Sequence, residues 1–225
     1  MYTNFETNQK FISDRQIRKI YRRYYLFNTK KGEKKKIYFK PYVATYANQI
    51  WHTDLKEFKN SEGIKKHLIA FLDDRTRYVV FWKILNDKTM ESTSQALKEA
   101  LEATDKKPYM MVMDNGREFT GSAFQEVLEK FQIKIWRTAP YTPRQNGKIE
   151  RSWRTIFQST MKDIPIEEQL ENLFQRYNTK WPNRMLNEIY ERKLRPKEAW
   201  DIGPVWTKDL DPDPQIIYAD SYYDK

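Results

Sequence analysis

Three strand-like runs follow one another directly in the chain, and this feature constrains its fold most strongly. The runs are IWHTDLKEF (residues 50–58), HLIAFL (67–72) and YVVFWKIL (78–85). The turn-like sequence DDRTR (73–77) separates the last two. Apolar, β-branched and aromatic runs bounded by turn residues are typical of strands, and short connections join antiparallel neighbours. The sequence therefore predicts a three-stranded antiparallel meander beginning at Ile50.

Helical and strand patterns alternate after the meander. In order, they are a helix over 87–104, a buried strand at 109–113, a helix from Ser122, a short strand at 133–136, and a helix carrying Ile149, Trp153, Ile156 and Phe157. Beyond Pro165, the series Leu170, Leu173, Phe174 and Tyr177 predicts another amphipathic helix, and RPKEAW (195–200) a short one. This order predicts an α/β fold with a mixed five-stranded sheet flanked by helices.

The charge is concentrated at the start of the chain. Residues 1–50 hold 12 Lys+Arg and 3 Asp+Glu, which is a net charge of +9 out of +10 for all 225 residues. We expect a basic N-terminal segment over 1–47, with a helix starting near Ser13 and a loop, before a core over 48–163. A C-terminal helical extension over 164–206 and an acidic tail over 207–225 complete the expected organisation. The basic segment indicates nucleic-acid contact, with a solvated basic tail as the alternative.

Composition limits the chemistry of the chain. It has no cysteine and two histidines, which excludes disulfides, thiolate zinc sites and Cys/His nucleophile pairs. No apolar run reaches the length of a membrane span and the N-terminus lacks a signal-peptide pattern, so we expect an intracellular protein without membrane contact. Any metal ion would have to bind carboxylates.

Three acids occupy positions where they could meet. Asp54 lies inside the first predicted strand, Asp114 at the end of the 109–113 strand, and Glu150 in the first turn of a later helix. Two carboxylates about 4 Å apart repel by roughly 4 kcal/mol at an effective dielectric of about 20, whereas a shared magnesium ion reverses the sign. On spacing alone the alternative stays open that Glu150 merely pairs with Arg154 on a helix surface.

Other polar residues have simpler interpretations. Asp73 and Asp74 lie in the predicted turn DDRTR, where aspartate forms turn hydrogen bonds. His52 precedes Asp54 by two residues on the same strand face, so it either orients the site or is a buried structural histidine. Glu118 is expected to brace the turn after Asp114.

Three stretches of the chain resemble the catalytic core of retroviral-type integrases and integrase-like DDE transposases. They are WHTDLKEF (51–58), VMDNGREFTGSAFQEVLEKFQIKIWRTAPYTPRQNGKIERSWRT (112–155) and YNTKWPNRMLNEIYERKLRPKEAW (177–200). In that family 35 residues separate the second acid from the third, as they separate Asp114 from Glu150 here. The resemblance covers roughly residues 46–201.

The resemblance implies a ribonuclease H-like fold with Asp54, Asp114 and Glu150 as the catalytic and metal-binding triad. It implies Mg²⁺ or Mn²⁺ as cofactor, with two ions when DNA is bound. The implied reaction is cleavage at a DNA end followed by strand transfer, in which the freed 3′-hydroxyl attacks target DNA. The residues expected to contact DNA, from the resemblance or from their own charge and place, are Asn115, Tyr141, Arg144, Gly147, Lys148, Arg151 and Arg154.

The chain also departs from the family pattern. A chain without cysteine cannot carry the zinc domain that precedes the core of retroviral integrases, and no C-terminal barrel-like unit is evident. Two alternatives therefore accompany the integrase interpretation: a ribonuclease H-like nuclease without joining activity, and a domesticated DNA-binding protein that kept the scaffold. The resemblance implies DNA partners and a homo-oligomer, in the nucleus of a eukaryote or the cytoplasm of a bacterium.

Overall fold

A computed structural model describes residues 2–3, 10–11, 42–138, 146–211, 214 and 216–218. The chain divides into two compact units, Met1–Phe39 and Lys40–Lys225. In the first unit, β1 (Tyr2–Thr3) pairs antiparallel with β2 (Lys10–Phe11). The predicted helix near Ser13 lies outside the described residues.

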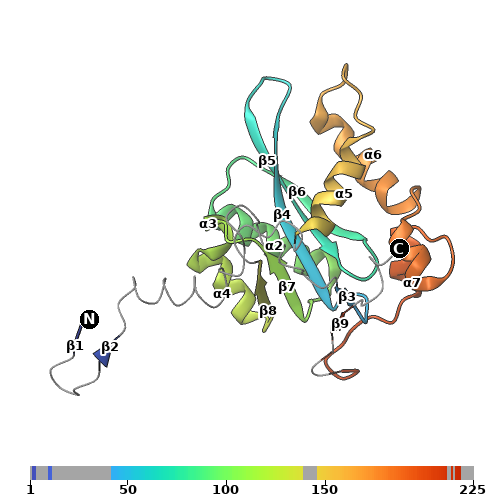
Figure 1. The fold of residues 1–225 in the computed structure, drawn as a ribbon. Helices are drawn as coiled ribbons and strands as arrows, with labels where there is room; N and C mark the ends of the chain where they lie inside the picture. The colour runs from blue at the N-terminus through green and yellow to red at the C-terminus, as the bar shows by residue number, and fades with distance from the viewer. Residues whose placement is uncertain are drawn as a thin grey trace, which may run out of the picture. The chain divides into compact units, whose positions relative to one another are not determined.

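The second unit is built on a five-stranded mixed sheet (Figure 1). Its strands are β4 (Ile50–Lys59), β5 (Lys65–Asp73), β6 (Val79–Leu85), β7 (Met110–Met113) and β8 (Lys134–Arg137), in the spatial order β6-β5-β4-β7-β8. The β4–β5 and β5–β6 pairs are antiparallel, and the β4–β7 and β7–β8 pairs are parallel. Both the predicted meander and the mixed five-stranded sheet are therefore confirmed.

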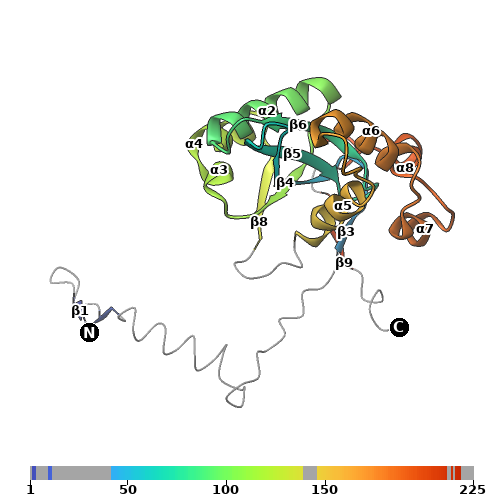
Figure 2. The same ribbon diagram turned by 90° about the horizontal axis from the view of Figure 1, so that it is seen from above.

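Helices cover both faces of the sheet (Figure 2). They are α2 (Met90–Thr104), α3 (Arg117–Thr120), α4 (Ser122–Lys130), α5 (Gly147–Phe157), α6 (Ile166–Thr179), α7 (Arg184–Tyr190) and α8 (Pro196–Ile202). The sequence predicted five of these and missed α3 and α7; α3, with four residues, is too short to show a helical period. None of the helices among the described residues is long and apolar enough to cross a membrane.

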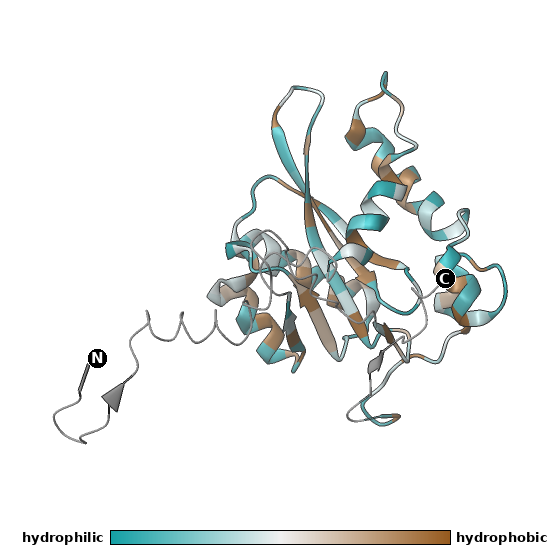
Figure 3. Cartoon of the chain, in the orientation of Figure 1, coloured by the Kyte–Doolittle hydropathy of each residue, from teal (hydrophilic) through white to brown (hydrophobic). Residues whose placement is uncertain are grey.

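Alternation along β5 produces two cores, one on each face of the sheet. Ile69 and Phe71 pack with α2 and α4, whereas Leu68, Ala70 and Leu72 pack with α5 and α6. Successive side chains of a strand point to opposite faces, so a continuous apolar run fits a strand that is covered on both sides. The hydrophobic colour in Figure 3 accordingly gathers on the central strands.

A second, two-stranded sheet joins distant parts of this unit. β3 (Tyr42–Ala44) pairs antiparallel with β9 (Ile216–Tyr218). β3 falls within the expected basic segment but belongs to the Lys40–Lys225 unit, and β9 falls within the expected acidic tail. Tyr42 and Ala44 are buried, so β3 contributes to the core beside the main sheet.

Candidate active site

Two of the three predicted acids emerge side by side from adjacent parallel strands. In the β4–β7 ladder His52 is opposite Val112, and Asp54 and Asp114 each follow two residues later. Asp114 comes directly after Met113, the last residue of β7. Because neighbouring strands lie about 4.8 Å apart and side chains alternate between faces, both carboxylates belong to the same face.

Helix α5 brings the third acid to this face. The Trp153 indole donates a hydrogen bond from Nε1 to Asp54 Oδ2, at 3.0 Å. Glu150 precedes Trp153 by three residues and so lies on the same side of the helix. Ile149 and Trp153 are buried against the sheet while Glu150 is exposed, which places Glu150 at the edge of the packed stripe.

The carboxylates influence one another electrostatically. The pKa of Asp54 is raised to about 6, mainly by burial and also by the negative charges of Asp114 and Glu150. Hydrogen bonds from the Trp153 indole and the Leu55 amide oppose this rise. The charge that destabilises ionised Asp54 is the kind that a bound cation would neutralise.

The turn after Asp114 connects the ends of two strands. The Gly116 amide donates to Asp114 Oδ1 at 2.8 Å, and the Asn115 side-chain amide donates to the Thr138 carbonyl at 2.7 Å. A Cβ on Gly116 would lie 2.7 Å from the Glu118 carboxyl carbon, so glycine lets that carboxylate approach the turn. Asn115, predicted to contact DNA, thus also ties the end of β7 to the residue after β8.

The predicted basic contacts differ in their surroundings. Arg151 and Arg154 are exposed on α5, and the described residues include no ion pair between Glu150 and Arg154. The Lys148 ammonium instead contacts Asp74 and donates to the Tyr42 carbonyl at 2.6 Å. The remaining predicted contacts are Gly147, which begins α5, and Tyr141 and Arg144, which lie outside the described residues.

The acids of the DDRTR turn have different roles. Asp73 Oδ1 accepts hydrogen bonds from the Thr76 amide and hydroxyl, which confirms its turn interpretation. Asp74 is fully buried and its Oδ1 lies 2.7 Å from His52 Nε2. His52 is itself fully buried, and its contact with Asp74 makes it part of an internal network of polar and charged side chains. This network could not be predicted from the sequence, because two aspartates before Arg-Thr-Arg are already explained by a turn.

The three acids are of the chemical type that binds a hard divalent cation, although their side chains do not converge closely on one point. Among the described residues, no group of three or more His, Cys, Asp or Glu side chains gathers closely enough to hold a metal ion. The three acids nevertheless supply only carboxylate oxygens, the ligands that Mg²⁺ and Mn²⁺ prefer, and the charges of Asp114 and Glu150 disfavour ionised Asp54. Their chemistry therefore fits the expected cofactor.

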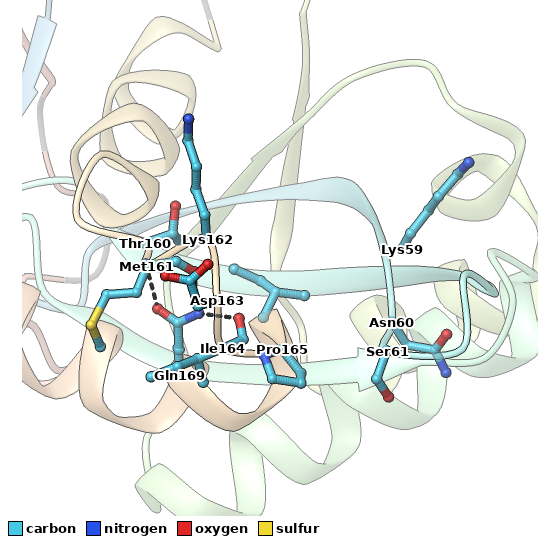
Figure 4. Close-up of a pocket in the computed structure, with 11 residues that line it drawn as sticks. Lys59, Asn60, Ser61, Thr160, Met161, Lys162, Asp163, Ile164, Pro165 and Gln169 are labelled. Carbon is cyan, nitrogen blue, oxygen red and sulfur yellow. Dashed lines mark hydrogen bonds between the residues drawn. The ribbon is translucent and has the colours of Figure 1, made fainter.

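A hollow of about 440 Å³ lies elsewhere, between the β4–β5 turn and the α5–α6 connection (Figure 4). Lys59 and Lys162 lie on opposite sides of this hollow. The Gln169 side chain forms hydrogen bonds with the Met161 and Ile164 backbones and so holds the α5–α6 connection. Its lining residues include none of the three acids. The hollow is therefore separate from the carboxylate site.

Comparison with known proteins identifies the core. Two family models, both described as "Integrase core domain", match residues 44–143 and 131–189. The Gag-Pro-Pol polyprotein of Squirrel monkey retrovirus is 28% identical over 111 residues, which are 48% of this chain and 6% of the polyprotein. The retrovirus-related Pol polyprotein from transposon TNT 1-94 of Nicotiana tabacum is 31% identical over 97 residues, or 43% and 7%. The chain thus spans less than a tenth of these relatives.

Solved integrase structures share the fold. The intasome of simian T-cell lymphotropic virus with PP2A regulatory subunit B56 gamma aligns with a TM-score of 0.61 at 17% identity, covering 73% of this chain and 59% of that one. The HTLV-2 integrase catalytic core domain with magnesium aligns with a TM-score of 0.52 at 20% identity, covering 63% and 92%. The predicted ribonuclease H-like fold is confirmed. Residues 44–189 form an integrase core domain of the retroviral type.

Proposed function

We propose that the chain is a DDE-type polynucleotidyl transferase that cleaves DNA ends and joins them to target DNA. The observation that carries this proposal is that Asp54 on β4 lies within the electrostatic reach of Asp114, just after β7, and of Glu150 on α5, within an integrase core. Asp54 and Asp114 come from neighbouring parallel strands, and Glu150 comes from the helix whose Trp153 holds Asp54.

Asp54, Asp114 and Glu150 would hold Mg²⁺ or Mn²⁺, with two ions when DNA is bound. Such ions, when bound, activate an attacking oxygen and stabilise the leaving one in phosphodiester displacement. The protein's own contribution is to fix the carboxylates. Trp153 orients one Asp54 oxygen, and the Gly116 amide orients one oxygen of Asp114.

Exposed basic residues would position the DNA. Arg151 and Arg154 lie on the outer side of α5 near Glu150, where a phosphate backbone could meet them. We also propose DNA contacts for Asn115, Gly147, Tyr141 and Arg144. A phosphate contact by Lys148 would require its ammonium to leave Asp74. The basic segment over 1–47 would add salt-sensitive affinity.

The enzyme would act inside the cell, where its DNA partners are, as a homo-oligomer. Joining two element ends to one target requires more than one active site. The integrase core of HTLV-2 was solved in trimeric and dimeric forms, and this is consistent with self-association here.

A strand-transfer assay tests the proposal. Purified protein is incubated with a 3′-recessed duplex, a supercoiled target and Mg²⁺ or Mn²⁺. We expect joined product from the wild type and from Glu129→Gln, a control on the exposed side of α4, but none from Glu150→Gln. Joining that persists in Glu150→Gln would contradict the proposed role of this residue.

The same assay separates the alternative nuclease function. A ribonuclease H-like nuclease would cut the duplex in a metal-dependent way but give no joined product. A domesticated DNA-binding protein would bind DNA and give neither product.

A further inference from the structure

A buried carboxylate connects several elements beside the proposed active site. Asp74, in the β5–β6 turn, has no exposed surface. Its Oδ2 accepts a hydrogen bond from the Ala44 amide of β3 at 2.8 Å, and its Oδ1 lies 2.7 Å from His52 Nε2 of β4. Arg77 Nη1 is 3.6 Å from the same Oδ1, and Lys148 Nζ of α5 contacts it directly. The Asp74 carboxylate therefore joins β3, β4 and α5.

Lys148 reaches this carboxylate from the first turn of α5. Only 18% of its side-chain surface is exposed, and its ammonium also donates to the Tyr42 carbonyl and lies 3.8 Å from the centre of the Tyr42 ring. A cation near a helix N-terminus opposes the helix dipole, so this placement needs the compensation that Asp74 supplies. The pair is thus a specific feature of the helix start.

Among the described residues, few other side chains hydrogen-bond to the backbone at the start of α5. Asn146, the N-cap residue, makes no side-chain capping hydrogen bond. The first backbone bond of the helix runs from the Glu150 amide to the Asn146 carbonyl, at 3.2 Å. Lys148 lies between these two residues, so the ion pair holds the turn from which Glu150 projects.

We propose that Asp74 and Lys148 are positioning residues, whose ion pair fixes the first turn of α5 and thereby the direction of Glu150. The inference rests on the proposed function, because it assigns Glu150 to the reaction. Buried ion pairs are better attested as devices that select one arrangement than as sources of net stability. An ion pair between a helix start and a turn of the sheet suits that use.

Three variants test the proposal: Lys148→Met, Asp74→Asn and the double variant that removes both charges. Lys83→Met is the control, since Lys83 pairs with Glu99 at 2.6 Å between β6 and α2, away from α5. For each protein we would measure DNA affinity, the single-turnover joining rate at saturating DNA, and the urea unfolding midpoint. Amide hydrogen exchange of 150–152 reports the helix start independently of activity.

A positioning role predicts a joining rate at saturating DNA that falls by roughly 10- to 100-fold in Lys148→Met. DNA affinity should change by less than about threefold, and exchange at 150–152 should accelerate while that of α6 does not. The double variant should recover the unfolding midpoint but not the joining rate. Two neutral partners restore stability, but they do not restore the ion pair that holds the helix start. If Asp74→Asn does not fold, the Lys148→Met and double variants still decide.

Other results would overturn the inference. Weaker DNA binding with an unchanged saturating rate would make Lys148 a DNA contact, and recovery of both midpoint and rate in the double variant would make the pair merely structural. Should the wild type show no joining, the proposed function fails. Hydrogen exchange at 150–152 then tests by itself whether the ion pair holds the helix start, and unchanged exchange in Lys148→Met rejects that role.

Discussion

Neighbouring residues of one type perform different tasks in this protein. Asp73 closes its turn through Thr76, whereas Asp74 binds the charged groups of other elements. Asp54, on the central strand, is held by Trp153 and repelled by the other acids. The local sequence predicted the turn and the strand, but partners distant in the sequence decide what each carboxylate does.

Replacement of Asp74 by asparagine should destabilise the fold in a pH-dependent way. Although burial alone would raise the pKa of Asp74, the charges of Lys148 and Arg77 and the His52 hydrogen bond lower it below the ordinary 3.8. The ionised form therefore stabilises the folded state above pH 3.8, and this contribution is lost as the pH falls through the lower folded-state pKa. We expect Asp74→Asn to lower the free energy of unfolding by about 3–5 kcal/mol at pH 7.

Urea unfolding at pH 7 and at pH 3 measures this effect. The difference between wild type and Asp74→Asn should shrink at pH 3, while the exposed control Asp209→Asn should match the wild type at both values. An equal difference at both pH values would show that the charge of Asp74 is not responsible.

Removing the Trp153 indole donor should slow the proposed reaction. Trp153→Phe leaves an aromatic ring in the same cluster but loses the hydrogen bond to Asp54 Oδ2. We expect the joining rate at saturating DNA to fall by roughly tenfold, since an active-site carboxylate loses its orienting partner. Trp82→Phe, in the same cluster and stacked on Phe174, is the control for lost packing. Equal rates in the two variants would count against an orienting role.

At the level of elements, patterns with several repeats predicted the fold and short or distant pairings escaped prediction. The meander, the β7 and β8 strands and the long helices follow from runs of apolar residues that recur with the strand or helix period. α3 has four residues, and β3 and β9 have three residues each and lie far apart in the sequence, so none carries a period. These elements depend on tertiary contacts.

The candidate site divides in the same way. Their places on two strands and at a helix start, together with the 35-residue gap between the last two, indicated Asp54, Asp114 and Glu150. Trp153 looked like an ordinary member of an apolar stripe because periodicity does not register its indole N–H. The partner of Lys148 could not be predicted either, because Asp74 is brought to it only by folding.

Two glycines at helix starts should respond oppositely to alanine. A Cβ on Gly121, the N-cap of α4, would lie 2.3 Å from Met90 Sδ and 2.6 Å from Met90 Cβ at the start of α2. We expect Gly121→Ala to lower the free energy of unfolding by about 1–3 kcal/mol through this overlap. No atom of the described residues lies within 4 Å of a Cβ added to Gly147, the first residue of α5, so Gly147→Ala should raise the free energy of unfolding by up to about 1 kcal/mol.

Urea unfolding midpoints of both variants provide the measurement. Coincident midpoints for Gly121→Ala and Gly147→Ala would mean that the close approach of α2 and α4 is not as tight as described.

Across the whole molecule, positive charge and proposed catalysis occupy different segments. The first 50 residues hold a net charge of +9, while the acids of the proposed site lie in the core. Binding and chemistry should therefore respond to different substitutions.

Neutralising the lysines and arginines of residues 1–47 should weaken DNA binding and its salt dependence. Each lost phosphate contact lowers the slope of log affinity against log salt concentration by about 0.9. Asp54→Asn should leave this slope unchanged. Fluorescence anisotropy with a labelled duplex at several salt concentrations measures both, and an unchanged slope in the neutralised protein would assign DNA binding to the core instead.

The most direct test of the account is a change of metal preference at one proposed ligand. Because the chain contains no cysteine, Asp114→Cys introduces a unique thiol, and thiolates accept Mn²⁺ more readily than Mg²⁺. We predict that Asp114→Cys joins DNA ends with Mn²⁺ but not with Mg²⁺, and that Asp114→Ser joins them with neither ion. If both variants joined DNA ends in Mg²⁺ as well as the wild type does, the claim that this carboxylate holds the catalytic metal would be contradicted.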